Sequence, residues 1–227
     1  CVMGGATLGV GGGSGIARNE TPYGCDEGGG IYAGDAGTRV TIDASQVMTN
    51  SAIIRGGGLY VGNGATATVR TGSVIWNNET FDFTGGGAGA YVAGAQSRLD
   101  VEQGTFRDNW SSNMGGGIYN AGGAVTLDGA SIGRNHAYSN GGGLFNDSGT
   151  VSGQGAWISY NDTQVGQGGG LYSLQGTVNL EGAGIYLNSA SASGGGAIAT
   201  WRTALTLARS HVAGNSAAGE GSALYIS

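Results

Sequence analysis

Side chains able to perform acid, base or metal chemistry are few in this sequence, and the most suggestive group is acidic. Asp100 and Glu102 alternate along one predicted strand, and the repeat pattern described below places Arg70 and Asp128 at the position of Glu102 in the neighbouring repeats. Carboxylates held this close could bind Ca²⁺ or act as a paired acid and base in cleaving a sugar polymer. An exposed charge column balanced by an arginine is the commoner outcome of such a pattern.

Other catalytic patterns are not supported by the sequence. His136 and His211 fall in different repeats, and neither has a Ser or Cys beside it in a nucleophile motif, so no catalytic triad is predicted. The glycine runs lack the lysine of a phosphate-binding loop, because the chain contains no Lys. Cys1 and Cys25 do not have the spacing of a metal site. We therefore expect neither a metal nor another cofactor.

Composition narrows the class of protein. The chain has 227 residues, of which 51 are Gly, yet 39% of its residues are hydrophobic. The formal charge is -6 and all nine basic residues are Arg, which argues against nucleic acid as a partner. No apolar run is long enough for a helix that crosses a bilayer, so no membrane span is expected. The apolar residues recur at regular intervals, which indicates order by repetition.

A glycine triplet followed by an aliphatic and an aromatic residue opens each repeat. Five full copies begin at Gly28, Gly56, Gly115, Gly141 and Gly168, and degenerate copies occupy residues 87–92, 194–199 and 221–226. Successive copies are 26 to 31 residues apart. A period of this length is typical of a solenoid, in which each repeat stacks on the next.

A second signature, an aliphatic or Phe residue three positions before an Asn, lies between the glycine triplets. The eight Asn residues are Asn19, Asn50, Asn78, Asn109, Asn135, Asn161, Asn188 and Asn215, with Asn77 as an alternative to Asn78. An alternating apolar pair such as Val40 and Ile42 precedes six of the Asn signatures and has the period of a strand with one buried face, whereas Val151 has Gly153 as its partner, so that coil is weak. At a corner between strands, stacked Asn amides can satisfy turn backbone groups and form a ladder.

These patterns predict an all-β chain in which residues 1–227 form one solenoid domain. Each period holds three short strand-like segments, so about eight three-strand coils of a parallel β-helix are expected, stacked at about 4.8 Å. The glycine triplets are expected at sharp corners, because a missing Cβ permits close backbone approach. Residues 1–27, which contain the only Pro, are expected to form an irregular coil or cap, and residues 221–227 to begin an incomplete coil.

Two segments match a known repeat pattern. Residues 195–198 read GGAI, which fits the motif GGA[ILV], and residues 106–109 read FRDN, which fits the motif FxxN. The chain thus resembles the polymorphic outer-membrane proteins of chlamydiae and related bacterial surface proteins, which carry both motifs in tandem. The resemblance implies a right-handed parallel β-helix that is exported or displayed on a surface and used in adhesion. It implies no catalytic residues.

One aromatic residue per repeat follows the aliphatic residue of the glycine phrase. If the aliphatic residue points inward, the aromatic column points outward and comprises Tyr32, Tyr60, Tyr91, Tyr119, Phe145, Tyr172 and Tyr225, with Ala199 as the one break. Ring stacking between neighbouring coils would explain the column on structural grounds alone. The alternative is a binding stripe for a glycan, a partner protein or a second solenoid, because contiguous exposed aromatics mark interaction sites.

The two ends of the sequence carry further expectations. Cys1 and Cys25 could form a disulfide, or Cys1 could be a lipid-modified residue left after signal-peptide cleavage. The apolar edge Ala223, Leu224, Tyr225 and Ile226 is in phase with the repeat and carries no charge. Exposed strand edges template further pairing, so this edge is expected to stack on another subunit or to continue into further sequence.

The sequence therefore favours a non-enzymatic structural or adhesive solenoid, exported to the cell surface or the extracellular space. Its expected partners are copies of itself stacked end to end, or a glycan or protein of a cell surface. The alternative is a β-helix that binds or cleaves polysaccharides, as pectate-lyase-like enzymes do. Ranks of Thr on the predicted strands also raise ice binding, but Arg39, Arg98 and Asp100 interrupt the flat surface that this function requires.

Overall fold

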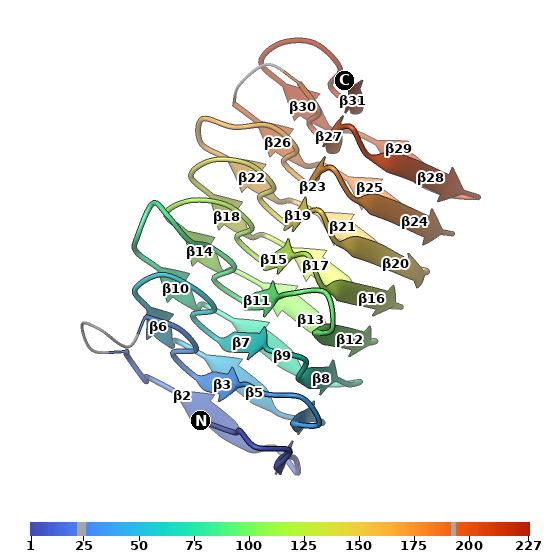
Figure 1. Cartoon of the computed structure of the whole chain (residues 1–227). Helices are drawn as coiled ribbons and strands as arrows, with labels where there is room; N and C mark the ends of the chain where they lie inside the picture. Colours follow the sequence, from blue (N-terminus) through green and yellow to red (C-terminus); the bar gives the residue numbers. More distant parts are fainter. Residues whose placement is uncertain (22–25, 192–193) are drawn as a thin grey trace.

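Parallel strands account for the regular secondary structure of the computed structural model, which describes residues 1–21, 26–191 and 194–227. The strands build four parallel sheets, and each full coil contributes one strand to every sheet (Figure 1). We name the sheets 1 to 4 in the order in which a coil visits them after its glycine triplet. Three strands per coil were expected from the sequence, and the structure corrects that number to four.

Sheets 1 and 2 contain the longer strands. Sheet 1 follows the glycine triplets and consists of β3 (Ile31–Ala33), β7 (Leu59–Gly62), β11 (Ala90–Ala93), β15 (Ile118–Ala121), β19 (Leu144–Asp147), β23 (Leu171–Leu174), β27 (Ile198–Trp201) and β31 (Leu224–Ile226). Sheet 2 holds the alternating apolar pairs and consists of β1 (Thr7–Val10), β4 (Arg39–Ile42), β8 (Thr66–Val69), β12 (Arg98–Glu102), β16 (Ala124–Asp128), β20 (Thr150–Gln154), β24 (Thr177–Glu181) and β28 (Ala204–Ala208).

Sheets 3 and 4 flank the Asn signature. Sheet 3 precedes the Asn and consists of β2 (Gly15–Ala17), β5 (Gln46–Met48), β9 (Val74–Trp76), β13 (Thr105–Arg107), β17 (Ser131–Gly133), β21 (Trp157–Ser159), β25 (Gly184–Tyr186) and β29 (His211–Ala213). Sheet 4 follows it and consists of the two-residue strands β6 (Ser51–Ala52), β10 (Glu79–Thr80), β14 (Trp110–Ser111), β18 (His136–Ala137), β22 (Asp162–Thr163), β26 (Ser189–Ala190) and β30 (Ser216–Ala217).

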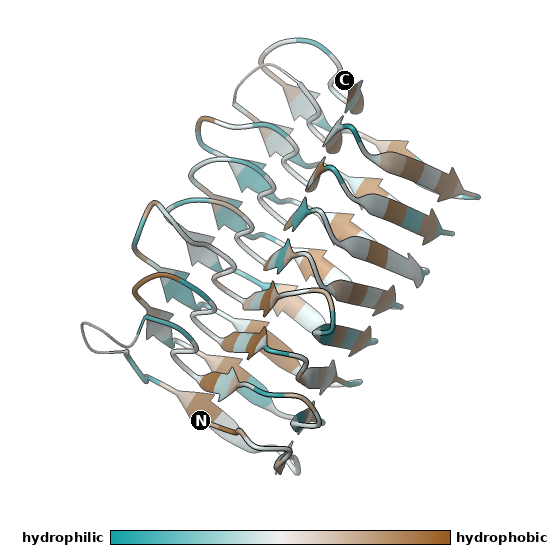
Figure 2. Cartoon of the chain, in the orientation of Figure 1, coloured by the Kyte–Doolittle hydropathy of each residue, from teal (hydrophilic) through white to brown (hydrophobic). Residues whose placement is uncertain are grey.

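The core is a set of apolar columns that run through the coils. Equivalent residues pair in register, so that Leu99 faces Val125 in sheet 2 and Phe106 faces Ile132 in sheet 3. These side chains are fully buried. Figure 2 shows the same alternation of apolar and polar segments along successive strands. Since a strand has a period of two, each inward column leaves a neighbouring outward column on the molecular surface.

The glycine triplets lie where neighbouring coils come closest. A Cβ built on Gly116 would lie 2.3 Å from the carbonyl oxygen of His136 and 2.6 Å from that of Gly142. The preceding Gly115 has a φ of 63°, a conformation that other residues adopt only with strain. The triplet therefore forms a corner at which backbone of the same and the neighbouring coil approaches too closely for a side chain to fit.

The two ends of the chain lie at opposite ends of the stack (Figure 1). Within residues 1–27, β1 pairs with β4 and β2 with β5 in the register of the later coils. Residues 22–25 lie outside the described residues, so the assignment of this segment as an irregular cap stays a prediction. None of the described residues forms a helix long and apolar enough to cross a membrane.

Candidate functional site

The Asn residues form a continuous hydrogen-bonded ladder at the corner between sheets 3 and 4. Asn135 shows the pattern: its Oδ1 accepts from the backbone N–H of Asn109 at 3.1 Å and from Asn109 Nδ2 at 2.9 Å. Its Nδ2 donates to the carbonyl oxygen of Phe106 and to Asn161 Oδ1, both at 3.0 Å. The same bonds resolve the ambiguity in favour of Asn78. The ladder holds coils together, and the amides of its buried members are engaged within it.

The residue before each ladder Asn has a left-handed backbone. Seven of these residues are not glycine, namely Arg18, Thr49, Asn77, Asp108, Arg134, Tyr160 and Leu187, with φ between 52° and 58°. Left-handed residues other than Gly cost free energy, so the surrounding structure must over-determine them. The consequence for the surface is that their side chains project from a sharp corner. Tyr160 and Leu187 are both largely exposed there.

The aromatic column of sheet 1 is a stack of rings. From Tyr32 to Tyr172, centroids of successive rings are 4.8 to 5.8 Å apart, and the column includes Tyr32, Tyr60, Tyr91, Tyr119, Phe145 and Tyr172. Tyr225 aligns with Ala199, where the column is interrupted. The structure therefore brings together six of the seven predicted residues by direct ring contact.

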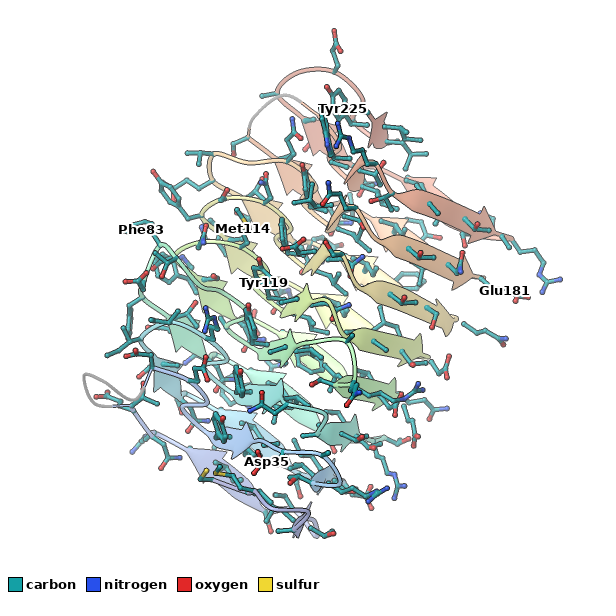
Figure 3. All side chains as sticks on the ribbon, viewed as in Figure 1. Asp35, Phe83, Met114, Tyr119, Glu181 and Tyr225 are labelled. Carbon is teal, nitrogen blue, oxygen red and sulfur yellow. The ribbon has the colours of Figure 1, made fainter. Side chains whose placement is uncertain are left out.

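Three rings of this column are buried, and Tyr32, Tyr119, Tyr172 and Tyr225 are half-buried. Only 7% of Tyr60, 8% of Tyr91 and 3% of Phe145 is exposed. Glycines of the connecting loops lie against the rings: a Cβ on Gly86 would be 2.9 Å from Cδ2 of Tyr119. In Figure 3 Tyr119 lies within the stack, whereas Phe83 projects from the edge of a loop. The column can stabilise the coils, and its role as a binding stripe stays a prediction.

Burial changes the chemistry of the column's phenol groups. Burial raises the pKa of Tyr60 and Tyr119. Neighbouring groups raise these pKa values further: Glu27 raises that of Tyr60, and Tyr91 raises that of Tyr119. The guanidinium of Arg55, 5.4 Å from the centre of the Tyr91 ring, opposes the rise in the pKa of Tyr91 without cancelling it. The folded protein thus holds these phenolic protons more tightly than an unfolded chain would.

The acidic group on sheet 2 is organised as surface ion pairs. Arg98 Nη2 lies 2.7 Å from Asp100 Oδ1, and Arg70 Nε lies 3.3 Å from Glu102 Oε2. Each carboxylate is thereby neutralised by an arginine, which is the arrangement of an exposed charge column. Among residues 1–21, 26–191 and 194–227, no three His, Cys, Asp or Glu side chains lie close enough to hold a metal ion.

The two histidines lie apart. His136 is in sheet 4, where its Nδ1 is 2.6 Å from Asp162 Oδ2 and its ring stacks on Trp110 at a centroid distance of 6.1 Å. His211 is in sheet 3. The pairing of His136 with Asp162 was not foreseen from the sequence. The common spacing of the ladder Asn residues would have revealed it, because each of the two residues directly follows a ladder Asn.

An exposed aromatic group on sheet 3 is the feature that sequence reasoning missed. Trp157 of β21 and Tyr186 of β25 have ring centroids 4.7 Å apart, with planes inclined by 38°. Together with the corner residues Tyr160 and Leu187 they surround a hollow of about 320 Å³, whose remaining lining residues are Ser159, Ala213 and Gly214. About half of the Trp157 side chain (51%) and of Tyr160 (55%) is exposed. We call this feature the Trp157 hollow.

The structure describes only some of the residues in the predictions about the two ends of the chain. Cys1 is exposed, but Cys25 lies outside the described residues, so the disulfide stays a prediction. On sheet 1, β31 pairs with β27 along one edge, and Leu224 and Ile226 are exposed. Self-association through this edge also stays a prediction. A Leu224→Lys substitution, followed by sedimentation at high concentration, tests it.

The four sheets and their in-register columns define a parallel β-solenoid of about eight turns. Comparisons of the chain with protein-family models, with curated proteins and with solved structures found no match.

Proposed function

We propose that this protein is a non-enzymatic solenoid of the cell surface or extracellular space, in which the stacked coils form a rigid scaffold that presents adhesive side chains. The observation that carries the proposal is the Trp157 hollow. Large apolar side chains are exposed there together, whereas the rings of the repeated aromatic column are buried or half-buried. Exposed aromatic groups of this kind mark places where a partner binds.

The repeat pattern supports the same proposal. Motifs of the GGA[ILV] and FxxN type resemble those of bacterial surface proteins used in adhesion, and the chain carries them on coils that stack in register. A scaffold of stacked coils stabilises each coil through its neighbours. Outward residues can therefore vary without loss of the fold, which suits a molecule whose task is display.

A binding experiment tests the proposal. Labelled protein is applied to arrays of cell-surface glycans and extracellular proteins, and we expect saturable retention on at least one immobilised partner. The variant Trp157→Ala should lose most of this retention while keeping the circular dichroism spectrum of the parent. If the protein is retained on no array component, the adhesive function is refuted.

A second assay distinguishes a non-enzymatic scaffold from a polysaccharide-cleaving enzyme. The protein is incubated with acidic and neutral polysaccharides, with and without Ca²⁺, and new chain ends are measured. We expect no turnover, because Asp100 and Glu102 are engaged by Arg98 and Arg70. Turnover that disappears in Glu102→Gln would instead establish a polysaccharide-cleaving enzyme.

A further inference from the structure

We infer that the Trp157 hollow binds one sugar ring of a neutral polysaccharide, with the ring resting on Trp157 and Tyr186. This inference rests on the proposed adhesive function and names the partner. It starts from the way in which the two rings are held. Trp157, Gly184 and His211 occupy one outward column of sheet 3, and Ser159, Tyr186 and Ala213 occupy the next.

Gly184 makes the aromatic surface possible. A Cβ at this position would lie 2.5 Å from Cε2 of Tyr186 and 2.9 Å from Cε3 of Trp157. Both rings therefore lean over the same glycine and lie against the sheet, one from the preceding coil and one from its own strand. The result is a pair of inclined ring faces above a strand that carries no side chain at that point.

Comparison with Trp76 shows that Trp157 is not simply another packed surface residue. The indole N–H of Trp76 donates to Gln46 Oε1 at 3.0 Å, and the guanidinium of Arg107 covers its ring at 4.7 Å. Trp76 is thus satisfied at both its polar edge and its face. The indole N–H of Trp157 has no hydrogen-bond partner in the part of the chain that the structure describes, and half of this side chain is exposed.

The polar groups around the hollow are hydroxyls without partners. Within the described residues, the side-chain hydroxyls of Ser159, Tyr160 and Tyr186 make no hydrogen bond, although Ser159 itself is buried. A sugar ring offers the complement of this surface, because its C–H face packs on aromatic rings and its hydroxyls both donate and accept. The hollow thus combines an apolar floor with several hydroxyls that no described protein group engages, which is the usual composition of a small-ligand site.

The size and charge of the hollow identify the class of sugar. At about 320 Å³, it lies at the lower end of the range of about 300–1,000 Å³ for ligand sites, which suits a single ring. None of the seven lining residues is charged, and the whole chain has a formal charge of -6 without any Lys. An acidic sugar ring would meet no cation among the lining residues, the corner arginine Arg134 lying one coil away, so a neutral polysaccharide is favoured. A protein partner would need a far larger contact, about 800 Å² on each side.

The test uses soluble neutral polysaccharides as probes: a β-glucan, a galactomannan and a xylan, with pectate as the acidic comparison. Affinity electrophoresis measures binding of the wild type and of Trp157→Ala, Ser159→Ala and Trp201→Ala. Trp201 is the matched control, because it is similarly exposed (43%) but lies on sheet 1. All variants are checked by circular dichroism, and Ser159→Ala keeps the aromatic surface intact if Trp157→Ala alters the fold.

We expect at least one neutral polysaccharide to bind, with about tenfold weaker binding in Trp157→Ala and about threefold weaker binding in Ser159→Ala. Trp201→Ala should bind as the wild type does. The inference is overturned if no neutral polysaccharide binds, if pectate binds better, or if Trp157→Ala and Trp201→Ala behave alike. Retention on a protein array that depends on Trp157, without polysaccharide binding, would overturn the sugar ligand and leave the adhesive function standing.

Discussion

The residues that matter most for stability are those whose polar groups are buried and shared between coils. Asn135 is the clearest case, because its side-chain amide bridges three coils through four hydrogen bonds. It is fully buried, so water cannot replace these partners without opening the corner. A polar atom left unpaired in such a place costs about 1–3 kcal/mol.

Replacing Asn135 with Ala should therefore lower the free energy of unfolding by about 3–5 kcal/mol, since several buried groups lose their partners. Denaturant unfolding followed by circular dichroism measures the change. Asn19→Ala is the control: this Asn is exposed, and its side chain only donates, to Asn50 Oδ1 and to the carbonyl oxygen of Ala17. Its loss should cost less than about 1 kcal/mol. Equal losses at both positions would contradict the role assigned to the buried ladder.

The phenols of the aromatic column predict how stability depends on pH. Burial raises the pKa of Tyr60 and Tyr119 above the ordinary value near 10, so the folded state binds these protons more tightly than the unfolded state does. Their contribution is fully present below the ordinary pKa and is lost as pH rises above it. We therefore expect the melting temperature to fall steeply above about pH 10.

The double variant Tyr60→Phe, Tyr119→Phe should flatten this alkaline decline, because Phe145 shows that the column accepts a ring without a hydroxyl. Melting curves at increasing pH measure the effect, and tyrosinate absorbance reports the ionisation itself. Tyr160→Phe, which changes an exposed tyrosine outside the column, should leave the decline as it is. An unchanged decline in the double variant would show that other groups control alkaline unfolding.

The length of a strand and the recurrence of its residues decide whether the sequence can predict it. The strands of sheets 1, 2 and 3 were predictable, because the glycine phrase, the alternating apolar pair and the Asn signature recur in phase. Sheet 4 was missed because its strands have two residues each, as in Ser51–Ala52 and His136–Ala137, which is too short for a period to show. The Trp157 hollow was missed because no Phe, Tyr or Trp recurs from coil to coil at the positions of its rings: Trp157 has no such counterpart, and Tyr186 has Trp76 alone, so no repetition reveals them.

The covering of the aromatic column also lay beyond the sequence. Strand alternation predicted that Tyr60 and Phe145 face away from the core, and they align with the other rings of the column in sheet 1. The alternation of inward and outward residues does not show whether a connecting loop covers the outer face of a strand. The close approach of Gly86 to Tyr119 depends on the path of a loop whose length differs from that of the other coils.

The close backbone approach at the glycine corners predicts that substitutions of different glycines change the stability of the fold by very different amounts. Gly116→Ala should destabilise the fold by about 2–4 kcal/mol, because the added Cβ would meet the carbonyl oxygens of His136 and Gly142. Gly9→Ala is the matched control, since a Cβ there has no neighbour within 4 Å, and its effect should stay within about 0.5 kcal/mol. Thermal unfolding compares the two. A mild Gly116→Ala variant would argue against the close corner.

At the scale of the whole molecule, the described strands of each coil pair only with those of the coils before and after it. One ring contact reaches past a coil, between Phe83 and Tyr138, whose centroids are 5.6 Å apart. Stability is then nearly a sum over coils and the interfaces between them. Deleting residues 141–167 joins Asn140 to Gly168, which stands at the same place in the repeat as Gly141. The remaining strands can pair in the same order, because β15 and β23 both pair with β19 in register.

We expect this deletion variant to fold with one coil fewer, to keep a strand-type circular dichroism spectrum, and to lose about one eighth of its denaturant dependence. Deleting residues 141–153 instead removes β19 and most of β20 but leaves β21, so the joined coil lacks two of its strands. This second variant should be far less stable. If the full-coil deletion fails to fold while the half-coil deletion folds, the coils are not independent units.

The positions of the two termini at opposite ends of the stack have a mechanical consequence (Figure 1). A force that pulls the termini apart acts along the direction of the hydrogen bonds between coils, so it opens them one coil at a time and never loads a whole sheet at once. Each opening releases a coil such as the 26 residues from Gly115 to Asn140, about 90 Å of extended chain. Under tension the molecule would therefore lengthen in many small steps at low force. Anything bound to one end of the stack would experience a gradual rise in force instead of an abrupt one.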